Sequence, residues 1–355
     1  MQSITASAPG RICLFGEHQD YLGLPVIAAA VDLRIEGSAK LNIQNQFAIN
    51  MPDIGESVTI DPNVPQAYGN HRDYLRSSIT ILRRLGVSWP LGLDITIGGN
   101  IPINAGVSSS SAMTVMWIRL LLEAGQNSPE FDSEQIARWA FAAEVTEFGD
   151  PGGMMDHFCA AVGGVLHIDT RPPFSAKSLA FPREGFVIGH SLEPKATLET
   201  LGSRRREVQL GIDQLKSQMP HFDLATTPLS DCETSLKHLD AVPRKRLLAN
   251  LKNRDITQSA LNVIEGHDAV KFGQLLYQHH LQLRDGLELS TPKLESMLDA
   301  SMTAGALGGK VNGSGGGGTM FAFAPGKQEA VADAIRSVGG VPYIVSVDKG
   351  VRIHL

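Results

Sequence analysis

The chain has 355 residues, of which 43% are hydrophobic, and it carries a net charge of −6. This composition is typical of a globular protein large enough to form two domains. No apolar run approaches the roughly 18 residues that a membrane span needs, and the start MQSITASAPG lacks the layout of a signal peptide. We therefore expect a cytoplasmic protein with no membrane partner, and the acidic balance argues against nucleic acid as a partner.

Cysteine spacing and basic runs add two further expectations. Cys13, Cys159 and Cys232 lie far apart without CxxC spacing, so they predict buried packing residues rather than a disulfide framework or a zinc site. The basic runs at 204–206 and 244–246 are expected on solvated helix faces.

The first half of the chain predicts a strand, a turn near residues 20–25 and a second strand, which together form a β-hairpin. Residues 91–101 alternate like another strand. A buried helix is expected from near Ser111 to Gly125. A second helix spans 132–148 behind a capping-box pattern, and a third covers about 153–162 before Gly163-Gly164.

The second half predicts a strand at 186–191 and then charged amphipathic helices to about residue 285. Ser290-Thr291-Pro292 marks the start of a helix that ends near Gly305. A glycine-rich loop at 308–318, a strand at 319–325, a helix at 327–338 and final strands complete the chain. Strands and helices in both halves predict an α+β protein of two lobes, residues 1–178 and 179–355.

Residues 101–112 read as a strand, a loop and a helix start that carries four serines in a row, Ser108 to Ser111. Unpaired N–H groups and the positive end of the helix dipole stabilise an anion there, and serine hydroxyls can bind phosphate or Mg²⁺. Simple N-capping is the alternative, but one serine would suffice for a cap. The run therefore favours a phosphate site.

The glycine-rich segment 309–318 formally contains GxGxxG, yet a strand follows it, whereas a dinucleotide-binding fold requires a helix there. It is no P-loop either, because the spacing to Lys310 is one residue short and Val311 replaces Ser or Thr. A flexible linker is the remaining alternative, but such linkers usually separate domains. We expect a wall that lets the backbone approach a ligand.

Two further segments place charged groups where chemistry is possible. Residues 10–21 gather an arginine, two carboxylates and a histidine at a strand-turn junction, which is typical either of hydroxyl binding or of solvated surface. Asp156 lies in an apolar, alanine-rich helix and needs a partner, although a satisfied structural aspartate is the commoner case.

Together these segments resemble the GHMP kinases, in the order of an N-terminal PGRxxLxGEHxDY, a central serine loop and a C-terminal glycine loop. Arg11 and Asp20-Tyr21 look like the galactokinase branch. Residues 143–158 and 283–294 match its patterns AExxxxGxPxGxMDxF and LRDxxExSxPxL. The resemblance implies a ribosomal-protein-S5-like N-terminal lobe and a ferredoxin-like C-terminal lobe, with ATP between them.

The resemblance also implies roles for individual residues. Asp156 would be the catalytic base or charge partner of a sugar hydroxyl, with Arg11 lowering its pKa. The sugar would be bound by Glu17, His18, Asp20 and Gly153. ATP would be bound by Gly106, Val107, Ser108, Ser109, Ser110, Ser111, Gly313, Ser314, Gly315 and Gly316. Ser111 and Glu144 would place Mg²⁺.

Some positions depart from the galactokinase pattern. Cys13, Gln19 and His157 replace the usual asparagine, threonine and glutamine, and no tyrosine precedes the run at 204–206. The expected function is ATP-dependent phosphorylation of a monosaccharide at its anomeric hydroxyl, by a monomer or homodimer, with galactose as first candidate. Another sugar, a sugar acid, mevalonate, or a non-catalytic sugar and ATP sensor are the alternatives.

Overall fold

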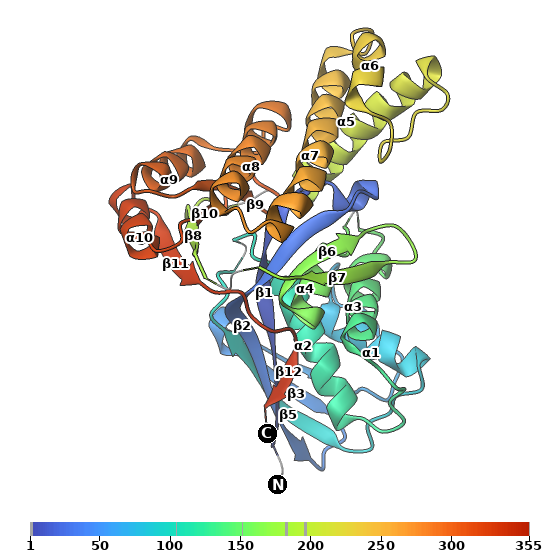
Figure 1. Cartoon of the computed structure of the whole chain (residues 1–355). Helices are drawn as coiled ribbons and strands as arrows, with labels where there is room; N and C mark the ends of the chain where they lie inside the picture. The colour runs from blue at the N-terminus through green and yellow to red at the C-terminus, as the bar shows by residue number, and fades with distance from the viewer. Residues whose placement is uncertain (1–2, 104, 151, 182–183, 195–196, 355) are drawn as a thin grey trace.

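The computed structural model describes residues 3–103, 105–150, 152–181, 184–194 and 197–354 (Figure 1). Asn104 and Pro151, which belong to two of the sequence motifs, lie outside the described residues. Within the described part the chain forms two lobes, each with its own sheet, as the sequence predicts.

The N-terminal lobe contains an eight-stranded sheet in the described residues, with strands in the order β12-β1-β2-β5-β3-β4, β6 beside β2 and β7 beside β6. Its strands are β1 (Ser3–Phe15), β2 (Val26–Asn42), β3 (Phe47–Met51), β4 (Glu56–Ile60), β5 (Gly92–Gly99), β6 (Val165–Asp169), β7 (Ser175–Leu179) and β12 (Arg352–His354). Its helices are α1 (Tyr74–Arg84), α2 (Ser109–Ala124), α3 (Ser133–Phe141) and α4 (Met155–Val162).

The long antiparallel pair β1–β2 is the centre of this lobe, and α2 packs against both strands. Residues 26–31 of β2 are fully buried, because both faces of the strand are covered. Gly37 of β2 has no side chain where α2 crosses, and a Cβ there would lie 2.5 Å from the Met116 sulfur. This close approach fixes how the helix that begins at the serine run lies on the sheet.

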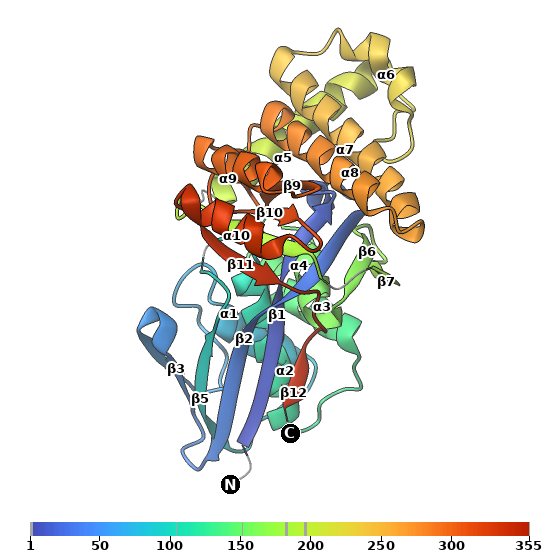
Figure 2. The ribbon, with the colours of Figure 1, turned by 60° about the vertical axis from the view of Figure 1, so that its left-hand side comes forward.

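The C-terminal lobe has a four-stranded antiparallel sheet in the order β11-β8-β10-β9. The strands are β8 (Phe186–His190), β9 (Gly308–Asn312), β10 (Thr319–Phe323) and β11 (Val341–Val345), and the helices are α5 (Thr197–Gln218), α6 (Leu229–Leu236), α7 (Ala241–Glu265), α8 (Ala269–Leu281), α9 (Pro292–Thr303) and α10 (Gln328–Ser337). The strand order is that of a ferredoxin-like fold. Helices α5 to α7 project beyond both sheets with a small core of their own (Figure 2).

Several predicted elements need correction. Helix α2 begins at Ser109 rather than near Ser111, and the helix predicted over 132–148 is α3 followed by a π-helical turn, Ala142–Thr146. The first half of the expected glycine loop is a buried strand, β9, because it pairs in register with β10. Arg246 is buried, not solvated, and pairs with Glu207 and Glu288. The three cysteines are free and buried, as predicted.

The last strand of the chain returns to the N-terminal lobe, where β12 pairs with the beginning of β1. The division predicted between residues 178 and 179 falls inside β7 and stays a prediction. Among the residues that the structure describes, no helix has the length and apolarity to cross a membrane.

The core of the N-terminal lobe gives a first prediction. Trp117 of α2 is fully buried and its indole N–H donates to the Leu75 carbonyl at 3.1 Å. Trp117→Ala should lower the free energy of unfolding by about 3–5 kcal/mol, because it leaves a cavity and removes the hydrogen bond of the indole N–H. Urea denaturation would measure this loss, with Ile43→Ala, 90% exposed, as a control close to wild type. Equal stability of the two variants would contradict the packing described.

Candidate active site

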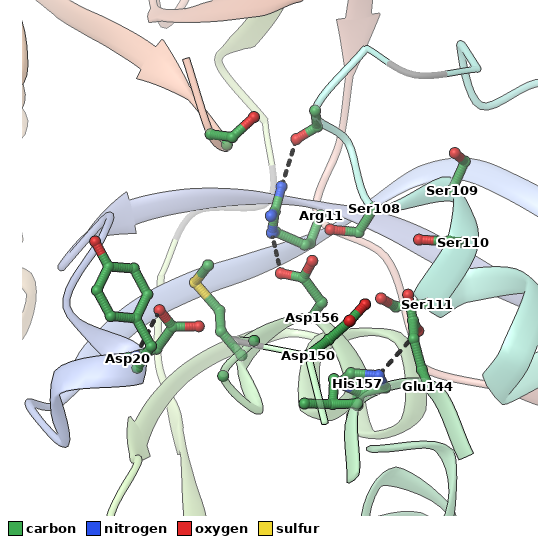
Figure 3. Close-up of a pocket in the computed structure, with 18 of the residues that line it drawn as sticks. Arg11, Asp20, Ser108, Ser109, Ser110, Ser111, Glu144, Asp150, Asp156 and His157 are labelled. Atoms are coloured by element: carbon green, nitrogen blue, oxygen red, sulfur yellow. Dashed lines mark hydrogen bonds and ion pairs between the residues drawn. The ribbon is translucent and has the colours of Figure 1, made fainter. Parts of the chain in front are cut away.

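A cavity of about 210 Å³ collects most of the residues singled out in the sequence (Figure 3). Of the predicted site residues, those that line it are Arg11, Glu17, His18, Asp20, Gly106, Ser108, Ser109, Ser110, Ser111, Glu144, Gly153, Asp156, Gly313 and Ser314. Segments more than 300 residues apart in the chain therefore meet in one pocket, with the glycine loop closing it from the C-terminal lobe.

The central interaction of the pocket is an ion pair between Arg11 of β1 and Asp156 in the first turn of α4. Arg11 Nε donates to Asp156 Oδ1 at 2.7 Å, and Arg11 Nη1 donates to the Gly106 carbonyl at 2.5 Å. Burial raises the pKa of the Asp156 carboxyl, but the charge and hydrogen bond of Arg11, together with smaller contributions from Ser108 and His157, outweigh burial, so this pKa lies below its ordinary value. Asp156 is therefore an ionised carboxylate with a quarter of its side chain exposed to the cavity.

The serine run, Ser108 to Ser111, forms one end of the cavity, at the N-terminus of α2. Ser108 is the N-cap residue in a left-handed conformation, with φ of 60°, and its side chain does not cap the helix. The first N–H groups of α2 thus keep no side-chain acceptor and can bind an anion. Figure 3 shows Ser108, Ser109, Ser110 and Ser111 along this edge, beside Arg11 and Asp156. The arrangement suits a phosphate group.

Glu144 and His157 form a buried pair at the same end. The π-helical turn after α3 carries Glu144, and His157 Nε2 donates to Glu144 Oε2 at 2.9 Å. Phe141 contacts the His157 ring edge-to-face, with centroids 5.5 Å apart. The histidine that replaces the expected glutamine therefore holds the Glu144 carboxylate in one orientation.

Ser111 and Glu144 present a hydroxyl and a carboxylate oxygen to the cavity, which are ligand types that Mg²⁺ prefers. Together with nucleotide phosphate oxygens they fit a magnesium ion. No group of three or more histidine, cysteine, aspartate or glutamate side chains that could hold a metal occurs in the described ranges.

Asp20 lies at the other end of the cavity, next to Gly153. Its Oδ1 accepts the N–H of Tyr21 at 2.9 Å, and a Cβ on Gly153 would lie 2.1 Å from its Oδ2. Burial and the neighbouring Asp156 carboxylate raise the pKa of Asp20 to about 7. Asp20 is therefore a hydrogen-bonding group that is partly protonated near neutral pH.

Glu17 and His18 line the cavity but also bind the glycine loop. Glu17 Oε2 accepts from Lys310 Nζ and from the Gly313 N–H, both at 2.9 Å. His18 Nε2 donates to the Ser314 carbonyl at 3.1 Å, and its Nδ1 accepts from the Tyr21 hydroxyl at 2.9 Å. Burial lowers the pKa of His18 to about 4, so the ring is neutral and this tautomer satisfies both nitrogens.

Three predicted ATP-binding residues do not line the cavity. Val107 is buried, with its carbonyl accepting the Arg11 N–H, and Gly316 N–H donates to the Leu289 carbonyl. Gly315 packs against the same Leu289, where a Cβ would lie 2.5 Å from the carbonyl oxygen. These residues shape the loops on either side of the pocket, and their contact with ATP stays a prediction.

Part of the lining comes from residues that none of the sequence motifs contains. Arg72 and Tyr74 reach the cavity from the start of α1, and Asp150 pairs with Arg72 at 3.5 Å. The only local signal was Asp73, whose side chain accepts the Arg76 N–H as an N-cap. That pattern predicts a helix start but not its place beside the serine run.

A cavity with a helix N-terminus at one end and an arginine-paired carboxylate beside it has the arrangement of a phosphotransferase. Comparison with known families agrees. Residues 73–164 match the GHMP kinases N terminal domain, residues 257–340 match the GHMP kinases C terminal model, and residues 1–40 match the galactokinase galactose-binding signature.

Whole-chain similarities point to two kinds of kinase. The chain is 32% identical to a mevalonate kinase of Thermococcus onnurineus, over 99% of this chain and 98% of that protein. It is 26% identical to a galactokinase of Exiguobacterium sibiricum, over 97% of this chain and 92% of that protein. The crystal structure of Lactococcus lactis galactokinase complexed with galactose superposes with a TM-score of 0.87 at 21% identity. The match covers 99% of this chain and 95% of that chain. The chain belongs to the GHMP kinase family, and the predicted two-lobed GHMP fold is confirmed.

The contact between Gly153 and Asp20 gives a second prediction. Gly153→Ala should force the Asp20 carboxylate to turn away and raise the KM for the phosphoryl acceptor by roughly 10-fold or more, because small misplacements in a site are costly. Nucleotide affinity, measured by calorimetry, should stay at the wild-type value. Gly69→Ala is the matched control, because its Cβ would meet nothing closer than 3.7 Å. An unchanged KM would remove Asp20 from the acceptor site.

Asp20 also gives a pH prediction. Its folded-state pKa of about 7 exceeds the ordinary 3.8, so between these values the folded state binds more protons than the unfolded state. The contribution of Asp20 to stability therefore falls as pH rises through this window. Asp20→Asn should abolish that component. The free energy of unfolding of the variant should therefore rise relative to that of wild type as the pH increases from 3.8 to about 7. Parallel pH profiles in urea denaturation would contradict the raised pKa.

Proposed function

We propose that this GHMP kinase uses Mg²⁺-ATP to phosphorylate a neutral monosaccharide at its anomeric hydroxyl, as a galactokinase does. The observation that carries the proposal is the charge pattern of the cavity. Around the cavity, the described lining contains five carboxylates, Glu17, Asp20, Glu144, Asp150 and Asp156, but only two arginines, Arg11 and Arg72. Each arginine already pairs with one of these carboxylates.

This pattern favours a neutral acceptor over an anionic one. The acceptor end combines Asp20, which can donate or accept a hydrogen bond, with Asp156, which is ionised. A carboxylate on the substrate would meet like charge without a free cationic partner among the described lining residues. Hydroxyl groups would instead be bound by carboxylate oxygens, a typical mode of sugar recognition.

ATP is assigned to the serine end. The N–H groups at the start of α2 and the hydroxyls of Ser108 to Ser111 would hold its phosphates, with Gly106 allowing close approach. Mg²⁺, held by Ser111, Glu144 and the phosphates, would neutralise charge that develops on the transferred group. His157 would keep the Glu144 carboxylate oriented for this role.

Asp156 and Arg11 are assigned to the chemical step. As the acceptor oxygen forms a bond to the γ-phosphorus and the bond to the ADP oxygen breaks, the hydroxyl proton passes to the Asp156 carboxylate. Arg11 holds this carboxylate in place and offers positive charge to the transferring phosphoryl group. Glu17, His18, Asp20 and Gly153 would form the acceptor end, with Gly313 and Ser314 closing over it.

Mevalonate is the second candidate acceptor, favoured by the 32% identity to the Thermococcus onnurineus mevalonate kinase. An ADP-release assay with Mg²⁺-ATP would decide between the two, with galactose, glucose, arabinose, fucose and N-acetylgalactosamine against galacturonate, glucuronate and mevalonate. Release with a neutral sugar supports the proposal. Release with mevalonate or a uronate alone would overturn the charge argument, and nucleotide binding without release by any acceptor would favour a sugar and ATP sensor.

The assigned base gives a third prediction. Asp156→Ala should abolish turnover, because it removes the carboxylate that accepts the proton, while nucleotide affinity should be largely retained. Asp156→Asn preserves the size of the side chain and should be equally inactive, which separates loss of charge from loss of packing. Isothermal titration with Mg²⁺-ADP and the ADP-release assay would test both variants. Turnover retained by either variant would remove Asp156 from the chemical step.

A further inference from the structure

Lys310 is a fully buried lysine that no sequence motif singled out for a role. It lies in β9 of the C-terminal lobe, and its ammonium group donates to the Cys13 carbonyl at 2.7 Å and to Glu17 Oε2 at 2.9 Å. Its charge also lies 5.2 Å from the centre of the Phe321 ring. A buried ammonium group is costly unless it is paired, so the contacts of Lys310 with β1 fix the position of β9 against the other lobe.

Glu17 connects this lysine to the backbone of the glycine loop. The same oxygen that pairs with Lys310 accepts the N–H of Gly313, and the side chain of Glu17 is only 3% exposed. Gly313 has φ of 78°, and a Cβ there would lie 2.9 Å from the Gly106 carbonyl oxygen. The carboxylate thus holds a point at which the glycine loop passes close to the serine loop.

Two residues that follow Lys310 in the chain also join the C-terminal lobe to the N-terminal lobe, and we call this set of contacts the seam. Asn312 accepts the Cys13 N–H at 2.9 Å and donates to the Gly106 carbonyl at 2.8 Å. Ser314 accepts from His18 through its carbonyl. Residues 310, 312, 313 and 314 are therefore each hydrogen-bonded to the N-terminal motif or to the serine loop, and all of these residues are buried.

We propose that Lys310 is a positioning residue for the acceptor end of the cavity, acting through Glu17. It compensates the buried charge of Glu17 and keeps that carboxylate aligned with the Gly313 N–H. The wall formed by Gly313 and Ser314 then faces Asp20 and Asp156 at a fixed separation. This inference rests on the proposed function only in assigning that wall to the acceptor; the seam itself is independent of which acceptor is used.

The alternative is that the Lys310–Glu17 pair only stabilises the fold. A double-mutant cycle of Lys310→Met, Glu17→Gln and the combined variant separates the two roles. Lys310→Met leaves an unpaired buried carboxylate and should be destabilised, whereas the combined variant removes both charges and should recover stability. Lys310→Arg, which keeps the charge, should retain part of the function. Lys237→Met, at the exposed residue that follows α6, controls for the substitution itself.

Two measurements would be made on each full-length variant. Hydrogen exchange with mass spectrometry on the peptide covering residues 308–318 reports whether the glycine loop is held, and it needs no acceptor. Steady-state kinetics reports the KM for the acceptor that wild type phosphorylates and the KM for ATP. We expect faster exchange in this peptide for Lys310→Met and for the combined variant. We also expect an acceptor KM raised on the order of 10- to 100-fold in both, with a smaller change for ATP.

The outcomes are distinguishable. If Lys310 acts through Glu17, Lys310→Met should add little to the acceptor KM in the Glu17→Gln background. If the combined variant recovers stability, slow exchange and the wild-type acceptor KM together, the pair is only structural and the proposal is overturned. Unchanged exchange and KM in Lys310→Met would overturn it as well. If wild type phosphorylates no sugar, the proposed function fails, while the exchange data still decide whether Lys310 holds the loop.

Discussion

The structure depends on one carbonyl oxygen, that of Gly106, and on the two side chains that donate to it. Arg11 reaches it from β1 at 2.5 Å and Asn312 reaches it from β9 at 2.8 Å. Gly106 has φ of 89°, and a Cβ there would lie 2.8 Å from the Asn312 carbonyl oxygen. Only glycine fits this meeting point without strain. Because Arg11 also binds Asp156, the four segments that carry the predicted site residues share one junction, and the fold cannot rearrange there without disturbing the cavity.

Much of the fold is predictable because its signals are local. The β1–β2 hairpin, the buried helix α2 and the capped helix α9 each have periodicity or capping residues within their own sequence. Residues 36–90 gave no such prediction, and there β3 pairs in parallel with β5 across more than 40 residues of chain. The return of β12 to β1 is equally non-local, since it joins the two ends of the chain. Pairings of this kind depend on the whole sheet rather than on any short pattern.

The site shows the same division between local and non-local information. Its main residues follow from motifs whose spacing is recognisable, and the cavity unites most of them. Lys310 lies 293 residues from Glu17, and neither residue indicates the other from its neighbours. Arg246 looked like part of a solvated basic run, yet Glu207 and Glu288 from other elements enclose it. Burial of a charge can be predicted only when its partner is known, and the partner comes from the tertiary fold.

The similarity to mevalonate kinases and the similarity to galactokinases do not carry equal information about the acceptor. Identity of 32% extends over 99% of this chain, and a scaffold shared to that degree does not by itself fix the acceptor. Acceptor choice is set by a few polar groups at one end of the cavity. There Asp20, whose pKa is raised, lies near the ionised Asp156. Arg11 already donates hydrogen bonds to Asp156 and to the Gly106 carbonyl. An anionic acceptor would need a cation that this end does not offer in its described lining, so local electrostatics supports the proposed neutral acceptor despite the higher overall identity to a mevalonate kinase.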